Sequence, residues 1–143
     1  AQDIPKYNLD GIAIKAIAGE LVVNGTAITG RVTGLSTEPG YLDIEFHKAS
    51  RLSVSIPSGY GAMVYFYEGE GRVGEQDHVF KKTQLARLSK EGDLVIDGAA
   101  GTKLLVITGK PIDEPIVQHG PFVMNSVDEI QQALRQYSDG TFV

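Results

Sequence analysis

Three histidines are the residues of this 143-residue chain best suited to bind a metal ion, because the chain has no cysteine. Imidazole binds Zn, Cu, Fe and Ni when several rings, often with a carboxylate, converge on one point. His47, His78 and His119 lie far apart, and none has a second histidine at strand or helix spacing. Three strands could still bring them together. Nothing in the sequence enforces that, so we interpret them as structural or surface residues.

A pair of glutamates and a glycine-rich stretch partly resemble catalytic or binding motifs. Glu68 and Glu70 alternate as an acid/base pair would, but they flank a predicted hairpin tip rather than the cleft that a glycosidase needs. The glycines between 59 and 74 are followed neither by Gly-Lys-Ser/Thr nor by a helix, as a phosphate-binding loop would require. We interpret these glycines as turn and bulge positions. The sequence offers no catalytic residue.

One aromatic-rich stretch holds the candidates for a ligand pocket. In a small barrel, such side chains either fill the core, as most strand aromatics do, or line a pocket. A pocket here would bind a small planar molecule without a metal. The candidate residues are Tyr60, Met63, Tyr65 and Tyr67.

Short strands separated by turns must position these residues. Tyr41 to Phe46 and Leu52 to Ile56 alternate apolar and polar residues, as half-buried strands do. Met63 to Tyr67 is apolar on both faces and suits a central strand, and Glu68 to Gly71 supplies a hairpin turn before a return strand. With 17 glycines, this spacing predicts an all-β antiparallel sandwich or barrel. Further strands are expected at residues 12–17, 21–23, 85–88, 94–97 and 104–108.

One short helix is predicted near the C-terminus, at about residues 126–138. Ser126 and Glu129 have the spacing of a capping box, and Gly140 is placed to end the helix. One helix face is apolar, which favours packing on its own domain over a partner-binding groove. This face comprises Val127, Ile130, Ala133, Leu134 and Tyr137. No linker or repeat interrupts the chain, so residues 1–143 are expected to form a single domain.

The charge of the chain excludes some classes of partner. The formal net charge is -5, and Lys81 and Lys82 are the only adjacent basic pair, so direct binding to nucleic acid is not expected. No apolar run approaches the length of a membrane span. We therefore expect a cytoplasmic protein that binds no membrane.

Three stretches resemble one known family. Residues 114–125 read EPIVQHGPFVMN, residues 56–74 read IPSGYGAMVYFYEGEGRVG, and residues 109–115 read GKPIDEP. Together they resemble the C-terminal cupin domain of pirins, which are built from two cupin barrels. The resemblance implies a cupin-type jelly-roll β-sandwich or barrel with a short C-terminal α-helix.

The resemblance also implies a barrel without a metal. In pirins the first barrel binds Fe or another transition metal through histidines and a glutamate. The corresponding strand of this chain places Ser55 and Pro57 at the histidine positions and Gly61 at the glutamate position. No histidine occurs between Gln84 and Gly98, where a last ligand would lie. We expect neither a metal nor another cofactor in this domain.

For function, the resemblance implies a non-catalytic second cupin domain that acts in interdomain or protein–protein contact. The expected partner is a pirin-like N-terminal cupin domain or a second copy of the chain. The alternatives are part of a quercetin 2,3-dioxygenase-like enzyme whose metal site lies in an N-terminal cupin domain, or a small-molecule-binding cupin. The expected docking residues are His119, Pro121, Phe122 and Met124.

Overall fold

The structure, a computed structural model, describes residues 3–75, 77–89 and 92–142. It divides into two compact units, Ala1–Pro111 and Ile112–Val143. The predicted class, all-β with one short C-terminal helix, is confirmed. That the two units form one domain stays a prediction. Within the described ranges, no helix combines the length and the apolar character needed to cross a membrane.

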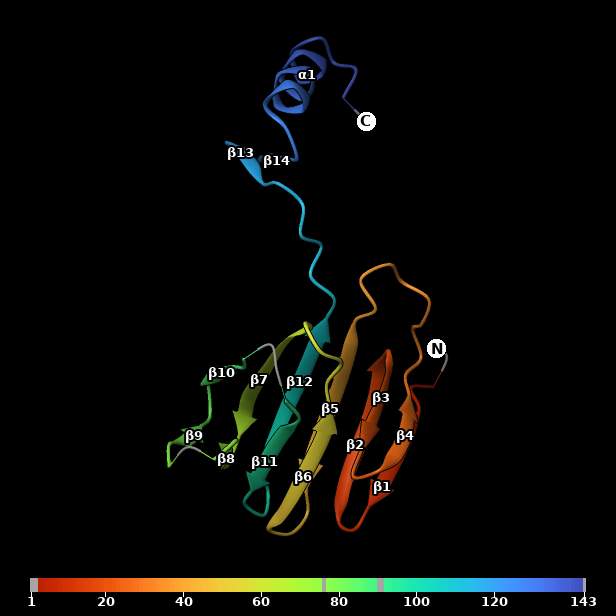
Figure 1. The fold of residues 1–143 in the computed structure, drawn as a ribbon, viewed down its shortest axis with the longest axis vertical. Helices are drawn as coiled ribbons and strands as arrows, with labels where there is room; N and C mark the ends of the chain where they lie inside the picture. The colour runs from red at the N-terminus through yellow and green to blue at the C-terminus, as the bar shows by residue number, and fades with distance from the viewer. Residues whose placement is uncertain (1–2, 76, 90–91, 143) are drawn as a thin grey trace. The chain divides into compact units, whose positions relative to one another are not determined.

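The first unit contains two antiparallel six-stranded sheets (Figure 1). The first sheet has the order β1-β2-β5-β12-β7-β10, and the second has the order β4-β3-β6-β11-β8-β9. The strands of the first sheet are β1 (Lys6–Leu9), β2 (Ile12–Ala18), β5 (Gly40–Phe46), β12 (Lys103–Gly109), β7 (Gly61–Glu68) and β10 (Leu85–Arg87). Those of the second sheet are β4 (Thr26–Thr29), β3 (Glu20–Val23), β6 (Ser50–Ser55), β11 (Leu94–Gly98), β8 (Glu70–Val73) and β9 (Val79–Lys81).

The core lies between the two sheets and follows from strand alternation. In β5 and β12 every second residue is buried, as expected for strands with one face inward. Phe46 and Phe66 are the largest fully buried side chains. Glycine makes room for one of these rings: a Cβ on Gly98 would lie 2.8 Å from three ring atoms of Phe46.

The hairpin turn predicted at residues 68–71 is wrong, although the strand predicted before it is present as part of β7. β7 pairs with β12 and β10 in the first sheet, whereas β8 pairs with β11 and β9 in the second. The chain crosses between the sheets at Gly69, whose φ is +70° and where an added Cβ would lie 2.7 Å from the Cα of Thr102. The Thr102 hydroxyl donates to the Glu70 carbonyl at 2.7 Å and fixes this corner. Glycine-rich corners and hairpin turns require the same backbone freedom, so the sequence could not separate them.

The second unit is a short hairpin with one helix. β13 (Val117–His119) pairs with β14 (Phe122–Met124), and α1 spans Val127–Ser138. The predicted capping box is confirmed: the Ser126 hydroxyl accepts from the Glu129 backbone N–H at 3.3 Å, and the Glu129 carboxylate accepts from the Ser126 backbone N–H at 2.8 Å. The buried helix residues are Ile130 and Ala133.

Candidate functional site

The positions that the sequence comparison was expected to match to a cupin metal site carry no metal ligand. Ser55 ends β6, Pro57 lies in the β6–β7 connection, and Gly61 begins β7. A hydroxyl, a proline ring and a hydrogen atom do not supply the imidazole and carboxylate donors that such a site needs. Among the residues that the structure describes, no group of three or more His, Asp or Glu side chains could hold a metal ion. These three positions therefore supply no ligand for a transition metal.

The three histidines have separate surroundings. His47 follows β5, and its Nδ1 lies 3.9 Å from Glu45 Oε1. The ring of His78 packs edge-on against Phe80, with centroids 4.6 Å apart. His119 is an exposed residue of β13 and belongs to the second unit. These contacts are those of surface residues.

The four predicted pocket residues do not share one cavity. Along β7, alternate residues face the core, and Phe66 is the aromatic that the core buries. Met63, Tyr65 and Tyr67 lie on the opposite, outer face of the strand. Tyr60 precedes β7 and lines a cavity at one end of the sandwich, whereas Tyr67 lines a different one. Ligand binding by the set of four stays a prediction.

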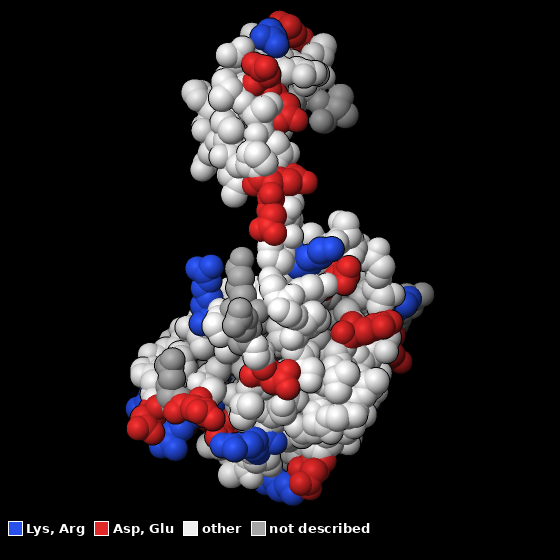
Figure 2. Space-filling model, viewed as in Figure 1, with Lys and Arg blue, Asp and Glu red and all other residues white. Residues whose placement is uncertain are grey.

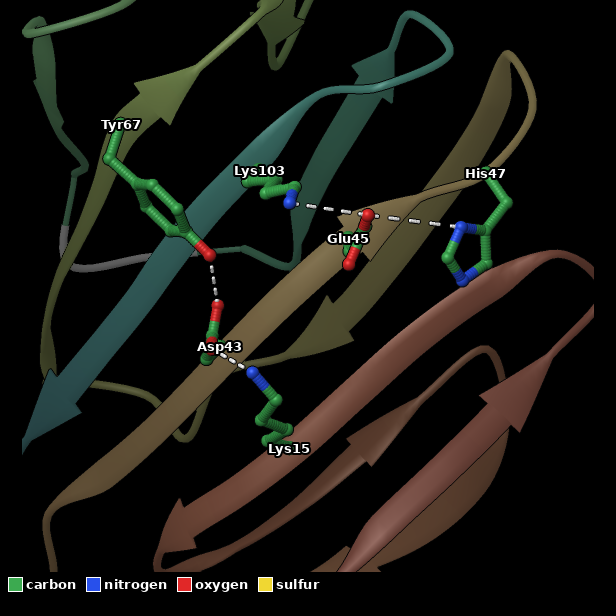
Figure 3. Close-up of polar contacts among 6 residues, drawn as sticks. All are labelled: Lys15, Asp43, Glu45, His47, Tyr67 and Lys103. Atoms are coloured by element: carbon green, nitrogen blue, oxygen red, sulfur yellow. Dashed lines mark hydrogen bonds and ion pairs between the residues drawn. The ribbon is translucent and has the colours of Figure 1, made fainter.

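Asp43 is the centre of a polar cluster on the outer face of the first sheet (Figure 3). Its Oδ1 accepts a hydrogen bond from the Tyr67 hydroxyl at 2.6 Å, and its Oδ2 lies 3.1 Å from Lys15 Nζ. Lys15 lies on β2 and Asp43 on the adjacent β5, whereas Tyr67 lies on β7, which β12 separates from β5. Burial and, to a lesser degree, the Asp43 contact raise the pKa of Tyr67 well above its ordinary value, so its hydroxyl remains a donor.

Glu45 extends the same cluster by two residues along β5. Its Oε1 lies 3.4 Å from Lys103 Nζ as well as near His47 (Figure 3). Both carboxylates of the cluster are thus paired with cations. These contacts link the strands. Neither carboxylate is left without a cationic partner, as a general base would be. The alternation of Asp43 and Glu45 already placed them on one face, but no sequence pattern indicated their partners.

The predicted docking segment is divided between a packed and an exposed part. Phe122 is half-buried, and its ring packs edge-on against Tyr137 and Phe142 at centroid distances of 6.0 and 5.4 Å. Met124 is also half-buried, whereas His119 and Pro121 are exposed. Docking through these residues stays a prediction.

The second unit exposes further apolar side chains beyond the four named docking residues. Ile116 is 81% exposed, and Val123, between the two half-buried residues of β14, is 58% exposed. On the helix, Tyr137 is 70% exposed, so much of the predicted apolar face is not covered within this unit. We call Ile116, Val123, Val127 and Tyr137 the exposed apolar set. Strand alternation in the FVM triplet was the available sign that Val123 faces away from Phe122.

Comparison with known proteins assigns the fold and the family. The sequence model of the Pirin C-terminal cupin domain matches residues 41–143. A Pseudomonas aeruginosa protein, provisionally named a quercetin 2,3-dioxygenase, is 42% identical over 141 residues, covering 97% of this chain and 50% of that protein. A pirin-like protein of Solanum lycopersicum is 34% identical over 142 residues, covering 97% and 47%. The crystal structure of a quercetin 2,3-dioxygenase from Acinetobacter baumannii is similar at a TM-score of 0.79 and 32% identity, covering 98% and 48%.

The two facing sheets with a C-terminal helix define a cupin-type jelly roll, as predicted. The described part of this barrel lacks a metal-binding group. The chain belongs to the pirin family and corresponds to its C-terminal cupin domain. It spans about half the length of the curated relatives that it matches.

Proposed function

We propose that this chain is a non-catalytic cupin domain that docks on the metal-bearing N-terminal cupin domain of a pirin-like protein. The matched relatives are about twice as long as this chain, which leaves room in them for a second barrel. The second unit provides the docking surface. The dioxygenase chemistry named for the Acinetobacter relative would then belong to the other barrel.

The observation that carries this proposal is the uncovered apolar surface of the second unit. Units below about 40 residues usually need disulfides, metals or association to be stable. This unit spans only Ile112–Val143, has no cysteine, and shows no metal-binding group among its described residues. The exposed apolar set is suited to association with a partner.

The charges of the second unit support a contact with an apolar centre. Its helix-containing part shows mostly uncharged surface on the face drawn in Figure 2. The sequence from 112 to 143 holds five acidic residues and one basic residue, Arg135. A largely uncharged surface of this kind is compatible with a protein–protein contact.

The residue chemistry at Ser55, Pro57 and Gly61 supports the non-catalytic part of the proposal, because none of the three can replace the ligands of a cupin metal site. Elemental analysis of the dialysed chain, with an assay of quercetin turnover, tests it. We expect no stoichiometric transition metal and no turnover. One metal per chain, lost when His47, His78 or His119 is replaced by alanine, would contradict the proposal.

A further inference from the structure

A cavity at one end of the sandwich is lined by both sheets and two connections. Its volume is about 370 Å³, which is within the range of small-molecule sites. Leu21 of β3, Thr108 of β12 and the connection residues Val32, Pro57 and Tyr60 contribute to its lining. All of these residues belong to the first unit.

Thr108 gives this cavity an unused hydrogen-bonding group. It is only 4% exposed, and its Oγ1 has no hydrogen-bond partner among the described residues. Thr102, the other buried threonine of the described chain, is fully engaged with the backbone of Glu70. Gly40 leaves the room for the Thr108 hydroxyl, because a Cβ there would overlap Oγ1. Buried polar groups are nearly always paired, so an unpaired one that lines a cavity indicates a missing partner.

A tyrosine and a glutamate form a second polar feature of the same cavity. The Tyr60 hydroxyl donates to Glu38 Oε2 at 2.5 Å. Glu38 has a φ of 42°, in the left-handed region, and directly precedes Pro39. Residues other than glycine rarely adopt this backbone conformation, and those that do are often found at binding sites. The hydrogen bond to Glu38, followed by burial, raises the pKa of Tyr60, so the hydroxyl keeps its proton at neutral pH.

We propose that this cavity binds a small, uncharged molecule with an apolar body and hydroxyl donors, such as a phenol. Leu21, Val32 and Pro57 supply apolar walls for the ring. Glu20 and Glu38 also line the cavity, and carboxylates accept hydrogen bonds from hydroxyl groups and repel anions. The Thr108 hydroxyl can donate or accept. This site goes beyond the proposed docking function and requires no second barrel.

Titration of the complete chain with catechol, followed by ¹H–¹⁵N NMR, tests the proposal. We expect saturable shift changes at Gly40, Tyr60 and Thr108, and no comparable changes with benzoate, an anion of similar size. Thr108→Val removes the hydroxyl with little change in shape, and binding should weaken about fivefold, as for loss of one hydrogen bond. Thr26→Val, on the exposed edge strand β4, is the matched control and should leave the affinity unchanged.

A second variant keeps the test decisive if Thr108→Val alters the fold. Tyr60→Phe retains the ring and removes the hydroxyl, and it should also weaken binding of catechol severalfold. The proposal is overturned if catechol causes no saturable shifts. In that case an ordered water molecule would be the hydrogen-bond partner of the Thr108 hydroxyl. It is equally overturned if benzoate binds as well as catechol, or if both variants bind catechol as the unmodified chain does.

Discussion

The ring of Phe122 packs edge-on against that of Tyr137, with centroids 6.0 Å apart and planes at 70°. The ring of Phe142 also packs edge-on against Phe122, with centroids 5.4 Å apart. Phe122 thus holds the short hairpin against the helix inside the second unit. The neighbouring Val123 is exposed, so two adjacent residues of one strand have different roles.

Phe122→Asp should therefore destabilise the second unit itself. The carboxylate would lose the two aromatic contacts and be placed at a half-buried position, at a cost of about 2 kcal/mol or more. Amide exchange of the α1 backbone should accelerate, while exchange in the sandwich strands stays slow. Unchanged protection of α1 would show that the ring is not needed for the packing of this unit.

Ser126→Ala should weaken the start of α1. The substitution removes the hydroxyl that accepts from the Glu129 N–H, and loss of an N-cap typically costs about 1 kcal/mol. Exchange of the first-turn amides reports this change directly. Ser138→Ala, at the exposed end of the same helix, is the control and should not reproduce the effect. Equal protection in the two variants would mean that the capping box does not stabilise the helix.

Gly98→Ala should destabilise the sandwich by about 1–3 kcal/mol, the usual cost of overpacking a core. The added methyl group would lie 2.8 Å from the fully buried ring of Phe46. Gly61→Ala is a matched control, because its Cβ would meet only the Gly109 carbonyl, at 3.9 Å. Denaturant midpoints of the two variants provide the comparison. Equal midpoints would mean that the Phe46 ring can move without cost.

The contact between Tyr67 and Asp43 predicts a loss of stability at alkaline pH. Burial, assisted by Asp43, raises the pKa of Tyr67 above the ordinary value of 10.0. The unfolded chain then releases this proton before the folded protein does, so the stabilisation is complete below about pH 10 and is lost as the pH rises further. Melting temperatures measured from neutral pH to above pH 10 should fall less for Tyr67→Phe than for the unmodified chain. Tyr65→Phe, on the same face of β7, serves as the control; if it flattens the decline equally, Tyr67 is not the group responsible.

The sequence predicted the interior of the fold better than its edges. Central strands such as β5 bury alternate residues and show a clear pattern, so their positions were correct. β1, β4 and β9 are edge strands with at most one fully buried residue each, so their sequences lack the clear alternation of the central strands. The apolar strip of α1 was correct, but its division into buried Ala133 and exposed Tyr137 depends on what the helix packs against.

Sequence reasoning reached the candidate sites only in part. The missing metal ligands at Ser55 and Pro57 could be read from residue types. The cavity near Thr108 could not, because it requires Glu38, Tyr60 and Thr108 to meet from three distant parts of the chain. The inward alternation of Leu104, Val106 and Thr108 was the one available sign of a buried hydroxyl.

Binding of this chain to the N-terminal half of the Pseudomonas aeruginosa relative tests the central claim most directly. Calorimetric titration, after circular dichroism shows that half to be folded, would compare Val123→Asp with Gln118→Asp. The two residues are cross-strand partners and both exposed, so each variant adds the same charge at nearly the same place. We predict association of the unmodified chain, at least about tenfold weaker binding for Val123→Asp, and a change of less than about threefold for Gln118→Asp. No association, or equal affinity for the two variants, would contradict docking through the exposed apolar set.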